Sequence, residues 1–152
     1  LSGPGLNASE ATATRIRLFL DENRALLNWR VLLAGDVPPA EVEKLVAQAS
    51  CIVLPSTYEG FGLPLAEALS FGKPVICSDI PPFREQLARY GCEALATLVP
   101  PDNARAIEDA MAAHLAAIPP AIDQQDLEQR LRRWTWADTA RRCRILLEKA
   151  HG

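Results

Sequence analysis

Apolar positions follow two different spacings along the chain. Short continuous apolar runs alternate with longer segments in which apolar side chains recur every three or four residues. Short runs are typical of strands buried in a parallel sheet, and the longer spacing is typical of amphipathic helices that cross between strands. We expect strands at 29–34, 51–54, 74–77 and 96–99. The pattern therefore predicts an α/β fold with a parallel sheet of about four or five strands, flanked by helices.

The segments between these runs predict helices with recognisable ends. Ser9 is a candidate N-cap for a first helix whose apolar positions include Ile16 and Phe19. Gly72 is a candidate C-terminal cap for a helix at 63–71. The other expected helices begin after Pro, Asp or Asn residues and lie at 39–49, 81–89, 103–117, 123–133 and 138–150.

The candidate chemistry is concentrated in residues 55–68, PSTYEGFGLPLAEA. This segment follows a predicted strand, and it places Glu59 in a loop and Glu67 in the first turns of the next helix. In a parallel sheet such a loop lies at the carboxyl ends of the strands, where ligands bind. The helix start offers backbone N–H groups and a partial positive charge to a phosphate. Gly60 and Gly62 let the backbone approach a ligand closely.

Carboxylates do not bind phosphates, so the natural partners of Glu59 and Glu67 are hydroxyl groups, from which they accept hydrogen bonds. A phosphate together with several hydroxyl groups describes a nucleotide sugar. On the residues alone, an alternative without a ligand stays open. Glu67 could simply complement the helix dipole, and Glu59 could be an exposed acid of the loop.

Composition narrows the class of protein. The 152 residues include 16 Lys or Arg and 19 Asp or Glu, a net charge of −3, which argues against a nucleic-acid binder that relies on a basic field. No apolar run approaches the roughly 18–20 residues of a membrane span. The four cysteines form no CxxC pair that would indicate a zinc or redox site. We expect Cys51 and Cys77 to be buried, reduced residues of a cytoplasmic protein.

Residues 55–68 resemble the donor-binding half of the retaining GT-B glycosyltransferases of family 4, also called glycosyl transferases group 1. That family carries two glutamates separated by seven residues, usually within a PS-x-x-EGFG-x-P-x-x-EA pattern. The likeness continues through LAGDV at 33–37, GKPVICSDIP at 72–81, LVPPD at 98–102 and Trp136, and so covers nearly the whole chain. It implies a Rossmann-like parallel sheet flanked by helices, as the C-terminal half of a GT-B fold.

The resemblance also implies roles for individual residues. Glu59 would be the catalytic residue and would accept a hydroxyl of the donor sugar, while Glu67 would hold the ribose hydroxyls. The backbone of the glycine loop would face the sugar and the diphosphate, and the turn at Val37 would line the base. Family members need no metal or other cofactor, because basic residues and the helix end stabilise the leaving nucleoside diphosphate. The implied donor-binding set is Gly60, Phe61, Gly62, Leu63, Glu67 and Val37.

The chain departs from the family in what it lacks. The family's basic pair, which grips the diphosphate, lies in a loop that would precede the first residue of this chain. Lys73 precedes a predicted strand and is expected at the opposite edge of the sheet, whereas Arg84 follows a strand and is a secondary phosphate-binding candidate. The acceptor half is also missing. We therefore expect residues 1–152 to be one donor-binding domain, an N-terminally truncated fragment of a two-domain bacterial enzyme of polysaccharide or glycoconjugate biosynthesis, inactive on its own.

The expected partner is a nucleotide-sugar donor. The resemblance implies a cytoplasmic enzyme whose full-length form could lie at the periphery of the inner membrane, with any membrane contact made through the missing half. Two other functions stay open. A dinucleotide-dependent oxidoreductase is suggested by GPGLNA at 3–8, which matches G-x-G-x-x-A, with Asp36 as the ribose-binding acid. A non-catalytic nucleotide-binding or assembly module of the same fold is the other.

Overall fold

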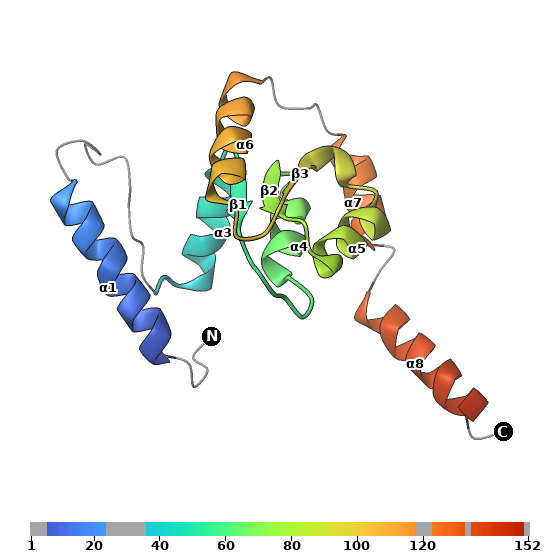
Figure 1. Cartoon of the computed structure of the whole chain (residues 1–152). Helices are drawn as coiled ribbons and strands as arrows, with labels where there is room; N and C mark the ends of the chain where they lie inside the picture. Colours follow the sequence, from blue (N-terminus) through green and yellow to red (C-terminus); the bar gives the residue numbers. More distant parts are fainter. Residues whose placement is uncertain (1–5, 24–35, 118–122, 133–134, 151–152) are drawn as a thin grey trace. The chain divides into compact units, whose positions relative to one another are not determined.

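The computed structural model describes residues 6–23, 36–117, 123–132 and 135–150 (Figure 1). The contacts within the chain divide it into two compact units, Leu1–Pro38 and Pro39–Gly152. In the first unit the structure describes helix α1, Leu6–Glu22. Ser9 lies inside α1, so the prediction that it caps the helix was wrong, because the leucine and alanine before it favour helix and extend it towards the N-terminus. The strand predicted at 29–34 lies outside the described residues.

The second unit contains the predicted alternation of strands and helices. Its elements in chain order are α3 (Pro39–Gln48), β1 (Ile52–Leu54), α4 (Leu63–Ser70), β2 (Val75–Ser78), α5 (Pro81–Tyr90), the short 3-10 helix η1 (Glu93–Leu95), β3 (Ala96–Val99), α6 (Ala104–Ala116), α7 (Gln124–Arg132) and α8 (Trp136–Ala150). These strands and α-helices begin and end within two residues of the predicted bounds.

The strands form one parallel sheet in the order β1-β2-β3. Ile52 of β1 pairs with Val75 of β2, and Val75 pairs with Ala96 of β3, so the three strands start level with one another. Every residue of the central strand β2 is buried. The predicted fold class, an α/β fold with a Rossmann-like parallel sheet flanked by helices, is confirmed, with three strands in the part of the chain that the structure describes.

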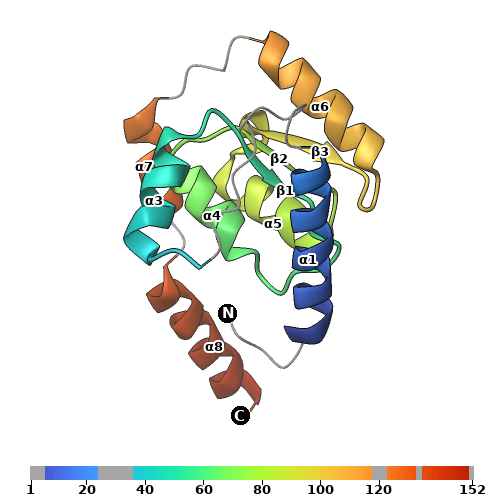
Figure 2. The ribbon, with the colours of Figure 1, turned by 90° about the vertical axis from the view of Figure 1, so that its left-hand side faces the viewer.

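Helices cover both faces of this sheet. Figures 1 and 2 show α4 and α5 on one face and α6 on the other. Side chains of β2 alternate between the faces: Val75 and Cys77 belong to the main core, and Ile76 lines the face under α6. Burying one large apolar side chain contributes about 1.5–3 kcal/mol, so this core fixes α4 and α5 against the sheet. Its buried members are Leu65, Ala68, Leu69, Val75, Cys77, Ile80, Phe83, Leu87, Tyr90, Cys92, Leu95 and Leu127.

Backbone and side-chain caps set the helix ends. Gly72 and Gly91 follow α4 and α5 with φ angles of 62° and 61°, the left-handed conformation that favours glycine. After α4, the N–H of Lys73 donates to the carbonyl of Ala68 at 3.1 Å, as in a Schellman motif. The predicted capping role of Gly72 is therefore confirmed. Of the two residues that could cap the next helix from the sequence, Asp102 and Asn103, the structure shows Asn103 as the cap of α6, where its side chain accepts a hydrogen bond from the N–H of Ala106.

Cys77 offers a pH-dependent test of the core. The side chain is fully buried on β2, and burial together with the charge of Asp79 raises the pKa of its thiol from 9.0 to about 11. The unfolded chain loses the thiol proton at a lower pH than the folded chain does. The contribution of this thiol to the free energy of unfolding is therefore fully present below pH 9.0 and is lost as the pH rises to about 11. We expect the free energy of unfolding to fall by about 2 kcal/mol. This is less than the full pKa difference would give, because solvent screens part of the effect of Asp79.

Urea unfolding across this pH range measures that decline. It should be smaller in Cys77→Ala and unchanged in Cys143→Ala, because Cys143 is exposed. An equally steep decline in Cys77→Ala would contradict the assignment of the effect to this thiol.

Candidate functional site

The loop between β1 and α4, residues 55–62, lies at the carboxyl edge of the sheet. The loop leaves the C-terminal end of β1, and because the strands are parallel, the segments after β2 and β3 leave from the same edge. Ligands of parallel α/β sheets bind at this edge. The segment that carries Glu59 and Glu67 therefore lies where the parallel topology predicted.

Glu59 is held by a neighbour in the same loop. Its side chain is half-buried, and the Ser56 hydroxyl donates to its Oε1 atom at 2.8 Å. Ser56 comes two residues after the end of β1, so this bond ties the carboxylate to a strand of the sheet. A carboxylate has about four acceptor sites, so Glu59 retains capacity for a ligand hydroxyl. Sequence analysis missed this role of Ser56, although a hydroxyl three residues before an acid was a usable signal.

Gly62 turns the chain into α4. Its φ of 84° and ψ of 58° are left-handed, and no side chain caps this helix end. The carbonyl of Gly62 accepts hydrogen bonds from the N–H groups of Leu65 at 3.1 Å and Ala66 at 3.4 Å. Pro64 has no N–H group, so the donors that remain at the helix start are those of Gly62 and Leu63. Together with the helix dipole, these donors make the start of α4 suitable for an anion.

Glu67 lies in the second turn of α4 and its side chain is exposed. The buried residues of this helix are Leu65, Ala68 and Leu69, so Glu67 is not part of the core-facing stripe. One glutamate thus precedes the start of α4 in the loop and the other follows it in the helix. Along the chain, this arrangement places one carboxylate, a possible acceptor for a hydroxyl group, on each side of a helix start that is suitable for an anion.

Residues of helix α5 contact the loop that precedes α4. The Gln86 side chain is 2 % exposed, and its Nε2 atom donates to the carbonyls of Phe61 and, at 3.2 Å, Gly62. A Cβ atom added to Gly62 would lie 2.5 Å from Cε1 of Phe83, so the loop and α5 are in close contact there. A small pocket of about 120 Å³ opens beside Gly60. Its lining is Gly60, Phe61, Pro81, Pro82, Glu85, Gln86 and Arg89.

Sequence analysis missed Gln86. The buried residues of α5 are Phe83, Gln86, Leu87 and Tyr90, which recur at helical spacing. Gln86 is the polar member of that stripe, and a polar residue at a core position was the signal that could have identified it.

Basic residues near the sheet already have partners. Both Nε and Nη2 of Arg84 donate to the carboxylate of Asp79, at the carboxyl edge, and this pairing lowers the pKa of the Asp79 carboxyl below its ordinary value. Lys73 precedes β2, and its Nζ atom donates to the carbonyl of Ala47 at 2.5 Å. Lys73 therefore lies at the amino ends of the strands, as predicted, and Arg84 lies at the ligand edge within an ion pair.

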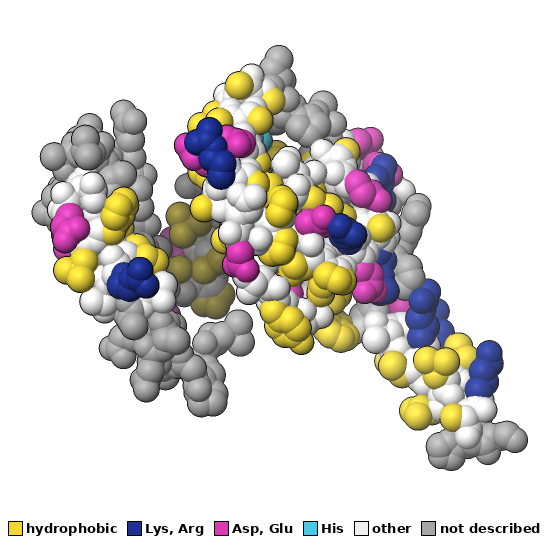
Figure 3. Space-filling model, viewed as in Figure 1, with side chains coloured by type: hydrophobic (Ala, Val, Ile, Leu, Met, Phe, Trp, Pro, Cys, Tyr) yellow, Lys and Arg dark blue, Asp and Glu magenta, His cyan; other side chains and the backbone are white. Residues whose placement is uncertain are grey.

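The remaining candidates differ in their surroundings. Val37 is half-buried in the first compact unit, whereas the other candidates belong to the second. Tyr58 is 85 % exposed, so it is not a packing residue, and Phe61 and Leu63 are also exposed. Figure 3 shows hydrophobic side chains gathered in the region where the loop before α4 lies in Figure 1. Carboxylates beside exposed apolar groups suit a ligand with both hydroxyl and apolar surface.

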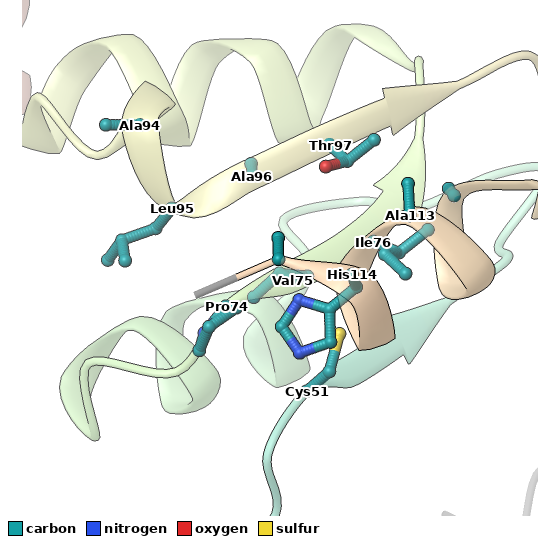
Figure 4. Close-up of a pocket in the computed structure, with 12 residues that line it drawn as sticks. Cys51, Pro74, Val75, Ile76, Ala94, Leu95, Ala96, Thr97, Ala113 and His114 are labelled. Carbon is teal, nitrogen blue, oxygen red and sulfur yellow. The ribbon is translucent and has the colours of Figure 1, made fainter. Parts of the chain in front are cut away.

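A second hollow lies at the opposite edge. It has a volume of about 240 Å³ between α6 and the amino ends of the strands, and Figure 4 shows Cys51 and His114 beside each other in it. The side chain of His114 is half-buried. Within the described ranges, no cluster of three or more His, Cys, Asp or Glu residues could hold a metal ion. The described helices also include none with the length and apolar character needed to cross a bilayer.

Known proteins resemble the chain along most of its length. Residues 8–134 match the family described as Glycosyl transferases group 1. O-antigen chain mannosyltransferase B of Escherichia coli is 45 % identical over 60 residues, which are 40 % of this chain and 16 % of that protein. GDP-mannose:cellobiosyl-diphosphopolyprenol alpha-mannosyltransferase of Komagataeibacter xylinus is 35 % identical over 117 residues, 74 % of this chain and 28 % of that protein.

A third relative is the lipopolysaccharide core biosynthesis mannosyltransferase LpsB of Rhizobium meliloti, 38 % identical over 92 residues, 60 % of this chain and 25 % of that protein. The residues that match cover only 16 % to 28 % of the length of each of these three relatives, so the chain corresponds to a part of them. The family match includes the whole loop, α4 and the sheet. By its parallel fold and by a match that covers most of its residues, the chain belongs to the glycosyl transferases group 1 family.

Proposed function

We propose that this chain is the donor-binding domain of a retaining, family 4 mannosyltransferase that takes GDP-mannose. The observation that carries the proposal is the arrangement of Glu59 and Glu67 around the uncapped start of α4, at the carboxyl edge of a parallel sheet. Family membership supports glycosyl transfer over the oxidoreductase alternative. The choice of mannose rests on the relatives, whose names describe mannosyltransferases, and one of those names includes GDP-mannose.

The nucleotide part of the donor would bind along α4. The diphosphate would accept hydrogen bonds from the N–H groups at the start of the helix, which the helix dipole makes favourable for an anion. The exposed Glu67 would accept hydrogen bonds from the ribose hydroxyls, and Val37 would line the base. The N–H groups at the start of α4 and the glutamate would together hold the diphosphate and the ribose of a nucleoside diphosphate.

The sugar part would lie over the loop. Glu59, oriented by Ser56, would accept a hydrogen bond from a mannose hydroxyl and hold the ring in place. Transfer then breaks the bond from the anomeric carbon to the diphosphate and forms a bond to an acceptor oxygen with retained configuration. The start of α4 and basic residues outside this chain would stabilise the negative charge of the leaving GDP, and no metal would be required.

The acceptor is proposed from the same relatives. Their names refer to O-antigen, lipopolysaccharide core and a polyprenol-linked saccharide, so we propose a saccharide of a bacterial surface polysaccharide as the acceptor. Recognition of this acceptor, and any contact with the inner membrane, is assigned to a part of the enzyme outside these residues. The enzyme would act in the cytoplasm, and residues 1–152 alone would bind the donor without transferring the sugar.

Substitution of Glu67 tests the nucleotide site. In the full-length enzyme, Glu67→Ala should weaken GDP binding about tenfold or more, because hydrogen bonds to a charged group contribute about 1.5–3 kcal/mol. Calorimetric titration with GDP measures the change. The matched control is Glu108→Ala, which removes an exposed glutamate on α6. Equal GDP affinity in wild type, Glu67→Ala and Glu108→Ala would contradict the assigned role.

A further inference from the structure

The buried amide of Gln86 makes a long-range contact with the loop that bears the proposed site. Gln86 lies on α5, and its Nε2 atom donates to the carbonyls of Phe61 and Gly62, which are 25 and 24 residues away in the sequence. Both carbonyls lie between Glu59 and the first residue of α4. One side chain therefore contacts two successive peptide groups at the turn into the helix, and the Gly62 carbonyl also accepts from the N–H groups of Leu65 and Ala66.

The direction of those carbonyls determines the direction of the neighbouring N–H groups. In a trans peptide the C=O and N–H bonds point to opposite sides, and the described residues contain no cis peptide. When the Phe61 and Gly62 carbonyls point towards Gln86, the N–H groups of Gly62 and Leu63 point away from α5. These are the two donors that remain at the start of α4.

The residue type supports a polar role over a packing role. Oε1 of Gln86 is buried without a hydrogen-bond partner, which costs about 1–3 kcal/mol. Its neighbours on the buried stripe of α5 are Phe83 and Leu87. An apolar side chain at this position would fill the same space without that cost, but it would leave the Phe61 carbonyl without the amide donor.

We propose that Gln86 is a positioning residue of the donor site. It holds the Phe61 and Gly62 carbonyls towards α5, and so directs the N–H groups of Gly62 and Leu63 at the diphosphate of the donor. Gln86 acts through this backbone and does not touch the substrate. The inference rests on the proposed function, because it requires a nucleoside diphosphate at the start of α4.

Two substitutions in the full-length enzyme test the role. Gln86→Leu removes both donated hydrogen bonds and should weaken GDP binding about tenfold, with a matching rise in the KM for GDP-mannose and little change in the KM for the acceptor. The control Gln125→Leu removes an exposed glutamine of α7 and should bind GDP like the wild type. Thermal unfolding verifies that each variant is folded.

Gln86→Glu adds a readout that a packing role would not affect. At about pH 8 the introduced carboxylate only accepts hydrogen bonds and repels the two carbonyls, whereas at about pH 5.5 burial favours its protonated form, which can donate one. GDP affinity of Gln86→Glu should therefore approach that of the wild type at the lower pH. The GDP affinity of the variant is divided by that of the wild type at the same pH, so that the effect of the titration of GDP itself cancels.

The outcomes separate the inference from the function on which it rests. A wild-type enzyme that binds no GDP would overturn both. A wild type that binds GDP, together with folded Gln86 variants of unchanged affinity, would overturn only the inference. If Gln86→Leu does not fold, the Gln86→Glu comparison decides, and an affinity ratio to the wild type that stays constant with pH would overturn the positioning role.

Discussion

Replacing Glu59 with Gln in the full-length enzyme should lower the rate of mannosyl transfer about a hundred- to a thousandfold and leave GDP affinity close to that of the wild type. The substitution keeps the size of the side chain but removes the negative charge that Ser56 holds in place. In our account that charge accepts a hydrogen bond from the sugar, orients the ring and stabilises positive charge near the anomeric carbon. GDP contains no such sugar, so its binding should not depend on Glu59.

Initial-rate kinetics with GDP-mannose and calorimetry with GDP measure the two effects. Glu67→Gln is the matched control, because it makes the same chemical change at the glutamate assigned to the ribose. It should weaken GDP binding more than Glu59→Gln does. Transfer at the wild-type rate in Glu59→Gln, or an equal loss of GDP affinity in both variants, would contradict the division of roles between the two glutamates.

Gly62→Ala should lower the free energy of unfolding by about 2–4 kcal/mol, the largest effect on stability that we expect in the loop. The φ of 84° is unfavourable for alanine, and the added Cβ atom would lie 2.5 Å from Phe83. Phe83 is a fully buried member of the core, so it cannot move away without disturbing the packing of α5 against the sheet.

Urea denaturation of the chain gives this number. Gly60→Ala is the control, because a Cβ atom at Gly60 meets nothing within 4 Å. It should change the free energy of unfolding by no more than about 0.5 kcal/mol. Equal stabilities of the two alanine variants would show that the left-handed turn at Gly62 is not needed for the fold.

The sequence predicted those features of the fold that depend on residues close together in the chain. The apolar runs identified β1, β2 and β3, and Gly72 marked a helix end that the structure confirms, while the start of α6 was predicted only to within Asp102 or Asn103. The wrong N-cap at Ser9 has a local cause as well, since helix-favouring residues before it outweighed the preference of serine for a cap. The capping box at the start of α8, in which Thr135 and Asp138 exchange hydrogen bonds, was missed.

The candidate site was predictable only in part. The positions of Glu59 and Glu67 around the start of α4 follow from local spacing and parallel topology. The contact between Gln86 and the Phe61 carbonyl joins residues 25 apart, and the approach of Phe83 to Gly62 depends on how α5 packs. No local pattern encodes such contacts, because they arise from the tertiary packing of two helices on one sheet.

The most direct test of the central claim is a titration of GDP-mannose into the ¹⁵N-labelled chain, followed by backbone NMR shifts. Our account predicts weak binding, with a Kd on the order of millimolar, because the basic residues assigned to the diphosphate lie outside these residues. The shifts should be concentrated in residues 59–67, with the amides of Gly62 and Leu63 among the largest. Shifts confined to the hollow around Cys51 and His114 at the opposite edge, or no shifts at saturating donor, would contradict the account.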